Sequence, residues 1–165
     1  MDIKRLESFL SAAERLRSSL DAFVEEQRAV GRAVRDKDWV ALERALAAAA
    51  AVGEAVARDE AARNAAWSAL VGELGLAPDT SAFRVSLALP MAAREALTDT
   101  CRALRLAAMR ARIESDALGS FVGDSASMLA KTLEELFPDR KVKVYGKSGK
   151  PKSVQSDAMV VNAAF

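Results

Sequence analysis

The sequence contains no histidine, one cysteine and only 5% aromatic residues, and these shortages limit what the chain can do. Without histidine it lacks the commonest general base and the commonest metal ligand. The single Cys101 excludes an internal disulfide, and its place beside an apolar helical stripe predicts a small buried side chain. The acidic residues are spread along predicted helices beside lysine and arginine, where surface pairs account for them. We therefore expect no catalytic residue, no metal site and no cofactor.

The chain also lacks an excess of charge of either sign and lacks long apolar runs. It has 24 basic and 23 acidic residues, for a net charge of +1. This balance gives no reason to expect a nucleic acid or an anionic membrane as partner. No window has the length and purity of a membrane span, so we expect no membrane insertion. The first residues are charged and contain no apolar signal-peptide core, from which we expect a cytoplasmic protein.

Proline is scarce, with four residues in 165 and none in the first 77. Hydrophobic residues make up 51% of the chain, many of them alanine, which is typical of closely packed helices. Apolar spacing predicts helices over about 2–35 and 38–74, joined by a turn at 36–39 with Asp36 or Asp38 as N-cap. One continuous helix through this turn is the alternative. Trp39 and Trp67 are expected to be bulky anchors near the two ends of the second helix.

A third and longer helix is predicted over 90–137, because Pro90 suits a first turn and Pro138 ends the pattern. It carries two apolar stripes about 100° apart. The first stripe contains Leu97, Leu104, Ala111, Leu118, Val122, Ser125, Leu129, Leu133 and Leu136. The second contains Leu106, Ile113, Ala117, Phe121 and Met128.

The segment 82–89 alternates apolar and other residues, as a strand does. A single short strand has no evident pairing partner in this chain. We therefore expect an extended linker or a short helix lying against the bundle. The predicted fold class is all-α: an antiparallel helical hairpin packed on a long third helix.

The character of the chain changes after Pro138. Six basic residues and no acid fall within residues 140–152, and Gly146, Gly149 and Pro151 disfavour a regular helix. Val142, Val144 and Tyr145 are suited to a short extended piece. The predicted organisation is a three-helix bundle over 1–137 followed by an irregular, flexible basic tail over 138–165.

The length of the third helix bears on function. Hairpin helices of about 35 residues cannot cover a helix of about 48 residues along its whole length. The C-terminal part of that helix would then present an apolar surface to a partner. The residues predicted to bind a partner helix are Phe121, Met128, Leu129, Leu133 and Leu136. The alternative is that both stripes are core, since one helix of a three-helix bundle touches both others.

Three segments give the chain a resemblance to a known family. They are Lys37-Asp38 followed by Leu42, Ser115 to Val122 in the third helix, and Val144-Tyr145-Gly146-Lys147-Ser148-Gly149. Together with the order of the helices, they resemble the FlgN family of flagellar type III export chaperones. The family often has asparagines in the middle of the third helix, where this chain has Ser115 and Asp116.

The resemblance implies a cytoplasmic chaperone that binds the C-terminal helical segments of flagellar hook-associated proteins, which form the hook–filament junction. It also implies delivery of these clients to the export gate or the export ATPase complex, with Tyr145 in contact with the gate. A self-associating helical scaffold, in which the exposed stripe pairs with a second copy in a homo-oligomer, is the alternative.

Overall fold

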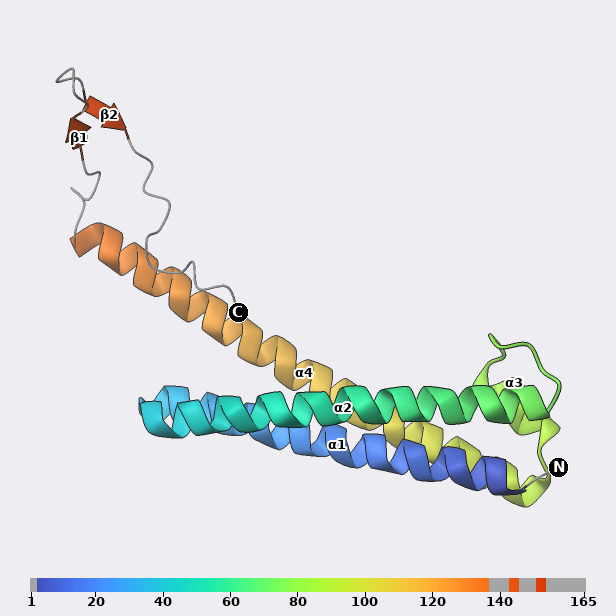
Figure 1. Cartoon of the computed structure of the whole chain (residues 1–165). Coiled ribbons are helices and arrows are strands. Elements are labelled where there is room, and N and C mark those ends of the chain that lie inside the picture. The colour runs from blue at the N-terminus through green and yellow to red at the C-terminus, as the bar shows by residue number, and fades with distance from the viewer. Residues whose placement is uncertain (1–2, 137–142, 146–150, 154–165) are drawn as a thin grey trace. The chain divides into compact units, whose positions relative to one another are not determined.

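The computed structural model describes residues 3–136, 143–145 and 151–153. The elements are α1 (Ile3–Asp36), α2 (Trp39–Glu73), α3 (Ala82–Ala88), α4 (Met91–Leu136), β1 (Lys143–Tyr145) and β2 (Pro151–Ser153). The predicted all-helical fold, a helical hairpin packed on a long helix, is confirmed (Figure 1). The chain divides into two compact units, Met1–Gly119 and Ser120–Phe165, called here the N-terminal and C-terminal units. Helix α4 contributes residues to both.

The turn between α1 and α2 is specified by local hydrogen bonds. Lys37 adopts a left-handed conformation with φ of 57°, and the N–H of Asp38 donates to the Ala33 carbonyl at 3.0 Å. The Asp38 carboxylate accepts from the Ala41 N–H at 2.9 Å, as an N-cap does. The continuous-helix alternative is therefore wrong, and Asp38 rather than Asp36 is the cap.

Helices α1 and α2 lie side by side and antiparallel (Figure 1). Polar contacts join them. The Ser19 hydroxyl of α1 donates to the Asp59 carboxylate of α2, and Nε of Arg5 lies 3.8 Å from Oε2 of Glu73. Gly53 of α2 faces Phe23 of α1, and a Cβ added at Gly53 would make an ordinary van der Waals contact with the Phe23 ring at 4.0 Å.

The hydrophobic core lies where the start of α1, the end of α2, the α3 segment and the start of α4 meet. Phe9 of α1 contacts Trp67 of α2, with ring centroids 5.1 Å apart. Trp67 is thus an anchor, as predicted, whereas Trp39 is 69% exposed and that prediction is wrong. Trp39 begins α2 at the turn end of the hairpin, away from this core. The buried cluster comprises Leu6, Phe9, Ala13, Leu70, Val71, Val85, Leu89 and Leu97.

The segment 82–89 forms the short helix α3, one of the two structures expected for it. Its N-cap is Ser81, whose hydroxyl accepts from the Arg84 N–H at 3.5 Å. Val85 and Leu89 are buried, whereas Phe83 and Leu87 are exposed. A spacing of four residues therefore explains the burial, and the alternation that resembled a strand is a by-product of it.

The first part of α4 runs alongside α1 in the same direction (Figure 1). Gln27 of α1 donates through Nε2 to the Ser115 hydroxyl at 2.7 Å, and Arg28 donates to Glu114 at 2.6 Å. Leu97, Ala107 and Ala111 are the buried residues of α4.

In the C-terminal unit, β1 and β2 pair antiparallel, with Tyr145 opposite Pro151. The extended piece predicted around Val142–Tyr145 thus corresponds in part to β1. The predicted flexibility of the basic tail concerns residues that mostly lie outside the described ranges. The predicted boundary at 137–138 also lies there and stays a prediction.

Candidate partner-binding surfaces

The first apolar stripe of α4 has two different environments along its length. Leu97 and Ala111 are buried, and Leu104 and Leu118 are half-buried. From Gly119 to Leu136 every residue of the helix is exposed. The apolar pattern of α4 therefore continues beyond Leu118, the last residue of the stripe that is at least half-buried.

The second stripe is exposed along its whole length. Leu106 and Ile113 have exposed fractions of 48% and 63%, and Ala117, Phe121 and Met128 are exposed as well. At about 100° per residue, Leu106, Met109 and Ile113 lie about 170° around α4 from the buried residues Leu97, Leu104 and Ala111. The interpretation of this stripe as helix–helix core is therefore wrong for the described part of the chain.

Polar contacts between α1 and α4 occur at Glu114 and Ser115, just before the exposed stretch begins. The buried Gln27 side chain donates a hydrogen bond from its amide N–H to the Ser115 hydroxyl. Its Oε1 has no hydrogen-bond partner in the described structure. The hydrogen bond from Arg28 to Glu114 raises the pKa of Arg28 above its usual range. The hydrogen-bonded side-chain pairs Gln27–Ser115 and Arg28–Glu114 therefore join α1 to the part of α4 that lies in the N-terminal unit.

The five residues predicted to bind a client helix lie together on one helix. At about 100° per residue they occupy an arc of about 140°. All five side chains are exposed, by 40% for Phe121 to 72% for Met128. The surface, called here the C-terminal apolar stripe, consists of Phe121, Met128, Leu129, Leu133 and Leu136.

Tyr145, predicted to contact the export gate, is the last residue of β1, where its backbone pairs with Pro151. The residues that follow it, 146–150, lie outside the described ranges. The role of its side chain stays a prediction.

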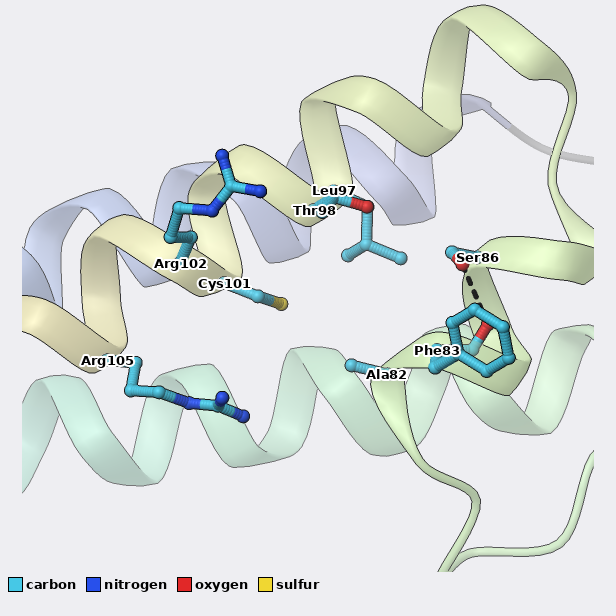
Figure 2. A pocket seen from close by; sticks show the side chains of 8 residues that line it. All are labelled: Ala82, Phe83, Ser86, Leu97, Thr98, Cys101, Arg102 and Arg105. Carbon is cyan, nitrogen blue, oxygen red and sulfur yellow. Dashed lines mark hydrogen bonds between the residues drawn. The ribbon is translucent and has the colours of Figure 1, made fainter.

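A cavity of about 250 Å³ between α3 and α4 was not predicted from the sequence. Figure 2 shows Leu97 and Cys101 of α4 directed toward α3, with the Phe83 ring on the facing side. The Ser86 hydroxyl is satisfied internally, since it donates to the Phe83 carbonyl at 2.7 Å. The lining residues are Ala82, Phe83, Ser86, Leu97, Thr98, Cys101, Arg102 and Arg105.

Cys101 was predicted to be a small buried side chain and is half-buried, because one side of it lines this cavity. Burial raises the pKa of its thiol, and the positive charges of Arg63 and Arg105 partly oppose that effect. The thiol is therefore largely protonated at neutral pH, and its reactivity is lower than that of a free thiol. The sequence placed Cys101 beside Arg102, but only the helical conformation of 82–88 brings Phe83 to the same place.

The described residues contain no group of acids and cysteine able to hold a metal ion. No helix among them has an apolar stretch long enough to span a bilayer. No family model, curated protein or solved structure matches the chain.

Proposed function

We propose that this protein is a helix-binding chaperone, which holds an amphipathic helical segment of a client against the C-terminal apolar stripe of α4. The observation that supports this most directly is the exposure of all five residues of that stripe. An apolar surface of this kind is costly in water and is typical of an interaction site. An amphipathic client helix covers such a surface with residues spaced i, i+3, i+4 and i+7.

The side chains of the stripe suit this role. Met128 has a flexible and polarisable side chain, which fits several client sequences. Phe121 supplies a large apolar area at the start of the stripe. Burying each large side chain is worth about 1.5–3 kcal/mol, so a few of them account for micromolar binding.

The more specific proposal is a FlgN-type export chaperone of the bacterial flagellum. It rests on the resemblance carried by Lys37-Asp38, by Ser115 to Val122 and by Val144 to Gly149. In this proposal the clients are the C-terminal helical segments of hook-associated proteins, held unpolymerised in the cytoplasm. Tyr145 contacts the type III export gate or the export ATPase complex. Its role is to deliver the client to the export apparatus, not to bind the client.

A self-associating scaffold is the second candidate, and the exposed residues Leu106, Met109 and Ile113 favour it. Light scattering separates the two readily. A monomer that forms a one-to-one complex with a client peptide supports the chaperone. A dimer or tetramer that persists at high salt, without affinity for the peptide, supports the scaffold.

Client binding is tested with the variant Met128→Glu/Leu129→Glu and a peptide from the C-terminal helix of a hook-associated protein. Two apolar contacts are lost and two charges are introduced, so we expect the Kd from isothermal titration to rise by about 100-fold or more. The matched control is Ser120→Glu/Ser127→Glu, which adds the same charges to exposed positions outside the stripe.

Circular dichroism should show equal helicity in both variants, because all four positions are exposed. If the control weakens binding as much as Met128→Glu/Leu129→Glu does, added charge and not the stripe is responsible. If Met128→Glu/Leu129→Glu unfolds the chain, the stripe is core and the proposal is wrong.

The delivery role is tested with Tyr145→Ala in a pull-down on the cytoplasmic domain of an export gate protein. We expect weaker capture by the gate, with helicity and client affinity unchanged. Tyr145→Phe is the control that separates the ring from the hydroxyl. A variant that loses client affinity and keeps gate binding would assign Tyr145 to the other partner.

A further inference from the structure

The part of α4 in the N-terminal unit carries a second feature that client holding does not use. Its outward side presents the apolar residues Leu106, Met109 and Ile113, which are about half exposed or more. Four arginines flank them within residues 102–112, and no acidic residue lies between Asp99 and Glu114. The arginines are Arg102, Arg105, Arg110 and Arg112.

These arginines are only partly compensated by acids of the same chain. Arg102 lies 3.4 Å from Asp99, and Arg112 lies 3.7 Å from Asp116, in pairs that are largely exposed. Within the described residues, no ion pair joins Arg105 or Arg110 to an acid. Arg110 lines a hollow together with Asp21 and Glu25 of α1, so acids of the same chain lie near it. Exposed pairs are weak, so the guanidinium groups of Arg102, Arg105 and Arg112 can be recruited by an external anion.

The cavity between α3 and α4 adjoins this basic and apolar surface. Arg102 and Arg105 line it, and none of its eight lining residues is acidic. Its floor is apolar, formed by Leu97, Cys101 and the exposed ring of Phe83 (Figure 2). An apolar cavity of about 150 Å³ can accommodate a benzene ring, so this cavity of about 250 Å³ has room for a large side chain.

We propose that the cavity and the adjoining stripe of Leu106, Met109 and Ile113 bind an acidic amphipathic helical segment of a partner protein. One apolar side chain of the partner enters the cavity beside Phe83 and Cys101. Its next apolar residues cover the stripe, and its flanking carboxylates pair with the arginines. This surface belongs to the N-terminal unit and shares no residue with the C-terminal apolar stripe, so the proposal goes beyond client holding.

The dimensions and charges agree with such an occupant. From Arg102 to Ile113 the surface runs about 16 Å along α4, which equals three turns of a bound helix. A partner helix with apolar residues at i, i+4 and i+7 matches that length. The arginines favour a partner helix that carries carboxylates. A basic helix would place its positive charges next to the arginines and is therefore disfavoured.

The probe is a pair of synthetic 15-residue amphipathic helices with the same apolar residues, one flanked by glutamates and the other by lysines. Fluorescence anisotropy is measured with the wild-type chain and with Arg102→Glu/Arg105→Glu. The control Arg44→Glu/Arg58→Glu makes the same charge change at exposed positions of α2. We expect the acidic peptide alone to bind, and Arg102→Glu/Arg105→Glu to raise its Kd about tenfold while the control does not.

The single cysteine gives a readout that is local to the cavity. The peptide should slow alkylation of Cys101 by iodoacetamide several-fold, because its side chain covers the thiol. Should Arg102→Glu/Arg105→Glu fold poorly, Phe83→Ala provides the same test at an exposed residue of α3. It should weaken both peptide binding and the protection of Cys101.

Three results would overturn the proposal. The first is equal binding of the two peptides. The second is an alkylation rate of Cys101 that saturating acidic peptide leaves unchanged. The third is protection of Cys101 from alkylation that increases with protein concentration in the absence of peptide. The last would identify the occupant as a second copy of this chain. Met128→Glu/Leu129→Glu should bind the acidic peptide as the wild type does, so a failure of this proposal is distinguishable from a failure of client holding.

Discussion

The two parts of α4, residues 91–118 and 119–136, have the same periodicity and different environments. Leu97 and Leu129 belong to the same predicted stripe, yet Leu97 is 1% exposed and Leu129 is 61% exposed. Hydrophobic spacing specifies which side of a helix is apolar, and it carries no information about what lies against that side. The first part therefore contributes side chains to the core, whereas the side chains of the second part are exposed.

Helix length accounts for part of this difference. Helices α1 and α2 contain 34 and 35 residues, whereas α4 contains 46. At about 1.5 Å per residue, α4 is about 17 Å longer than either hairpin helix. This difference amounts to 11 or 12 residues, whereas the 18 residues from 119 to 136 are all exposed. The exposed part of α4 is therefore longer than the mismatch in helix length requires.

Leu97→Ala and Leu129→Ala should show the largest difference in stability between the two parts of α4. Leu97→Ala removes a fully buried side chain from the core cluster and should lower the free energy of unfolding by about 2–5 kcal/mol. Leu129→Ala removes an exposed side chain and should change it by no more than about 0.5 kcal/mol. Urea unfolding followed by circular dichroism measures both. Equal losses would show that the two parts of α4 are packed alike.

A smaller effect is expected where the packed part of α4 ends. Ser115→Ala leaves the buried Nε2 of Gln27 without its acceptor and should destabilise the chain by about 1–2 kcal/mol. Ser127→Ala makes the same change at an exposed position of the second part and should have almost no effect. If Ser115→Ala is as neutral as Ser127→Ala in urea unfolding, water replaces Ser115 and the contact to α1 is dispensable.

The smallest effect concerns the helix propensity of the exposed part. A Cβ added at Gly119 or Gly123 meets nothing within 4 Å, so Gly119→Ala/Gly123→Ala should stabilise the helix locally by about 1 kcal/mol per site. Amide hydrogen exchange should slow in residues 119–136 and stay unchanged around Leu97. Slower exchange throughout α1 and α2 would mean that the exposed part unfolds together with the bundle, contrary to the comparison.

Most of the helix pattern could be predicted from the sequence because its causes are local. The turn at 36–39 could be placed from the end of apolar spacing in α1 and from two candidate caps, and the structure identifies Asp38 as the cap. The segment 82–89 was harder, since Val85 and Leu89 satisfy both a spacing of two and a spacing of four. Only the buried cluster that receives these two side chains decides between the two structures.

The candidate surfaces were predictable in part. The C-terminal apolar stripe could be named from helix length and spacing, whereas the cavity beside Cys101 could not. Its lining comes from two elements, and Phe83 and Cys101 meet only because α3 folds onto the start of α4. The exposure of Trp39 was missed for a related reason, since a large aromatic residue predicts burial only where a neighbouring helix is present.

Local sequence patterns were sufficient to predict that the chain is helical, the approximate extents of the three long helices, and which side of the long third helix is apolar. These properties depend on residues within a few positions of one another, through capping, propensity and spacing. Tertiary packing specifies which apolar sides are covered, that Gln27 contacts Ser115, and that α3 and α4 line an open cavity beside Cys101. Burial depends on contacts between residues far apart in the chain, and no local pattern of residues encodes which helix lies against which.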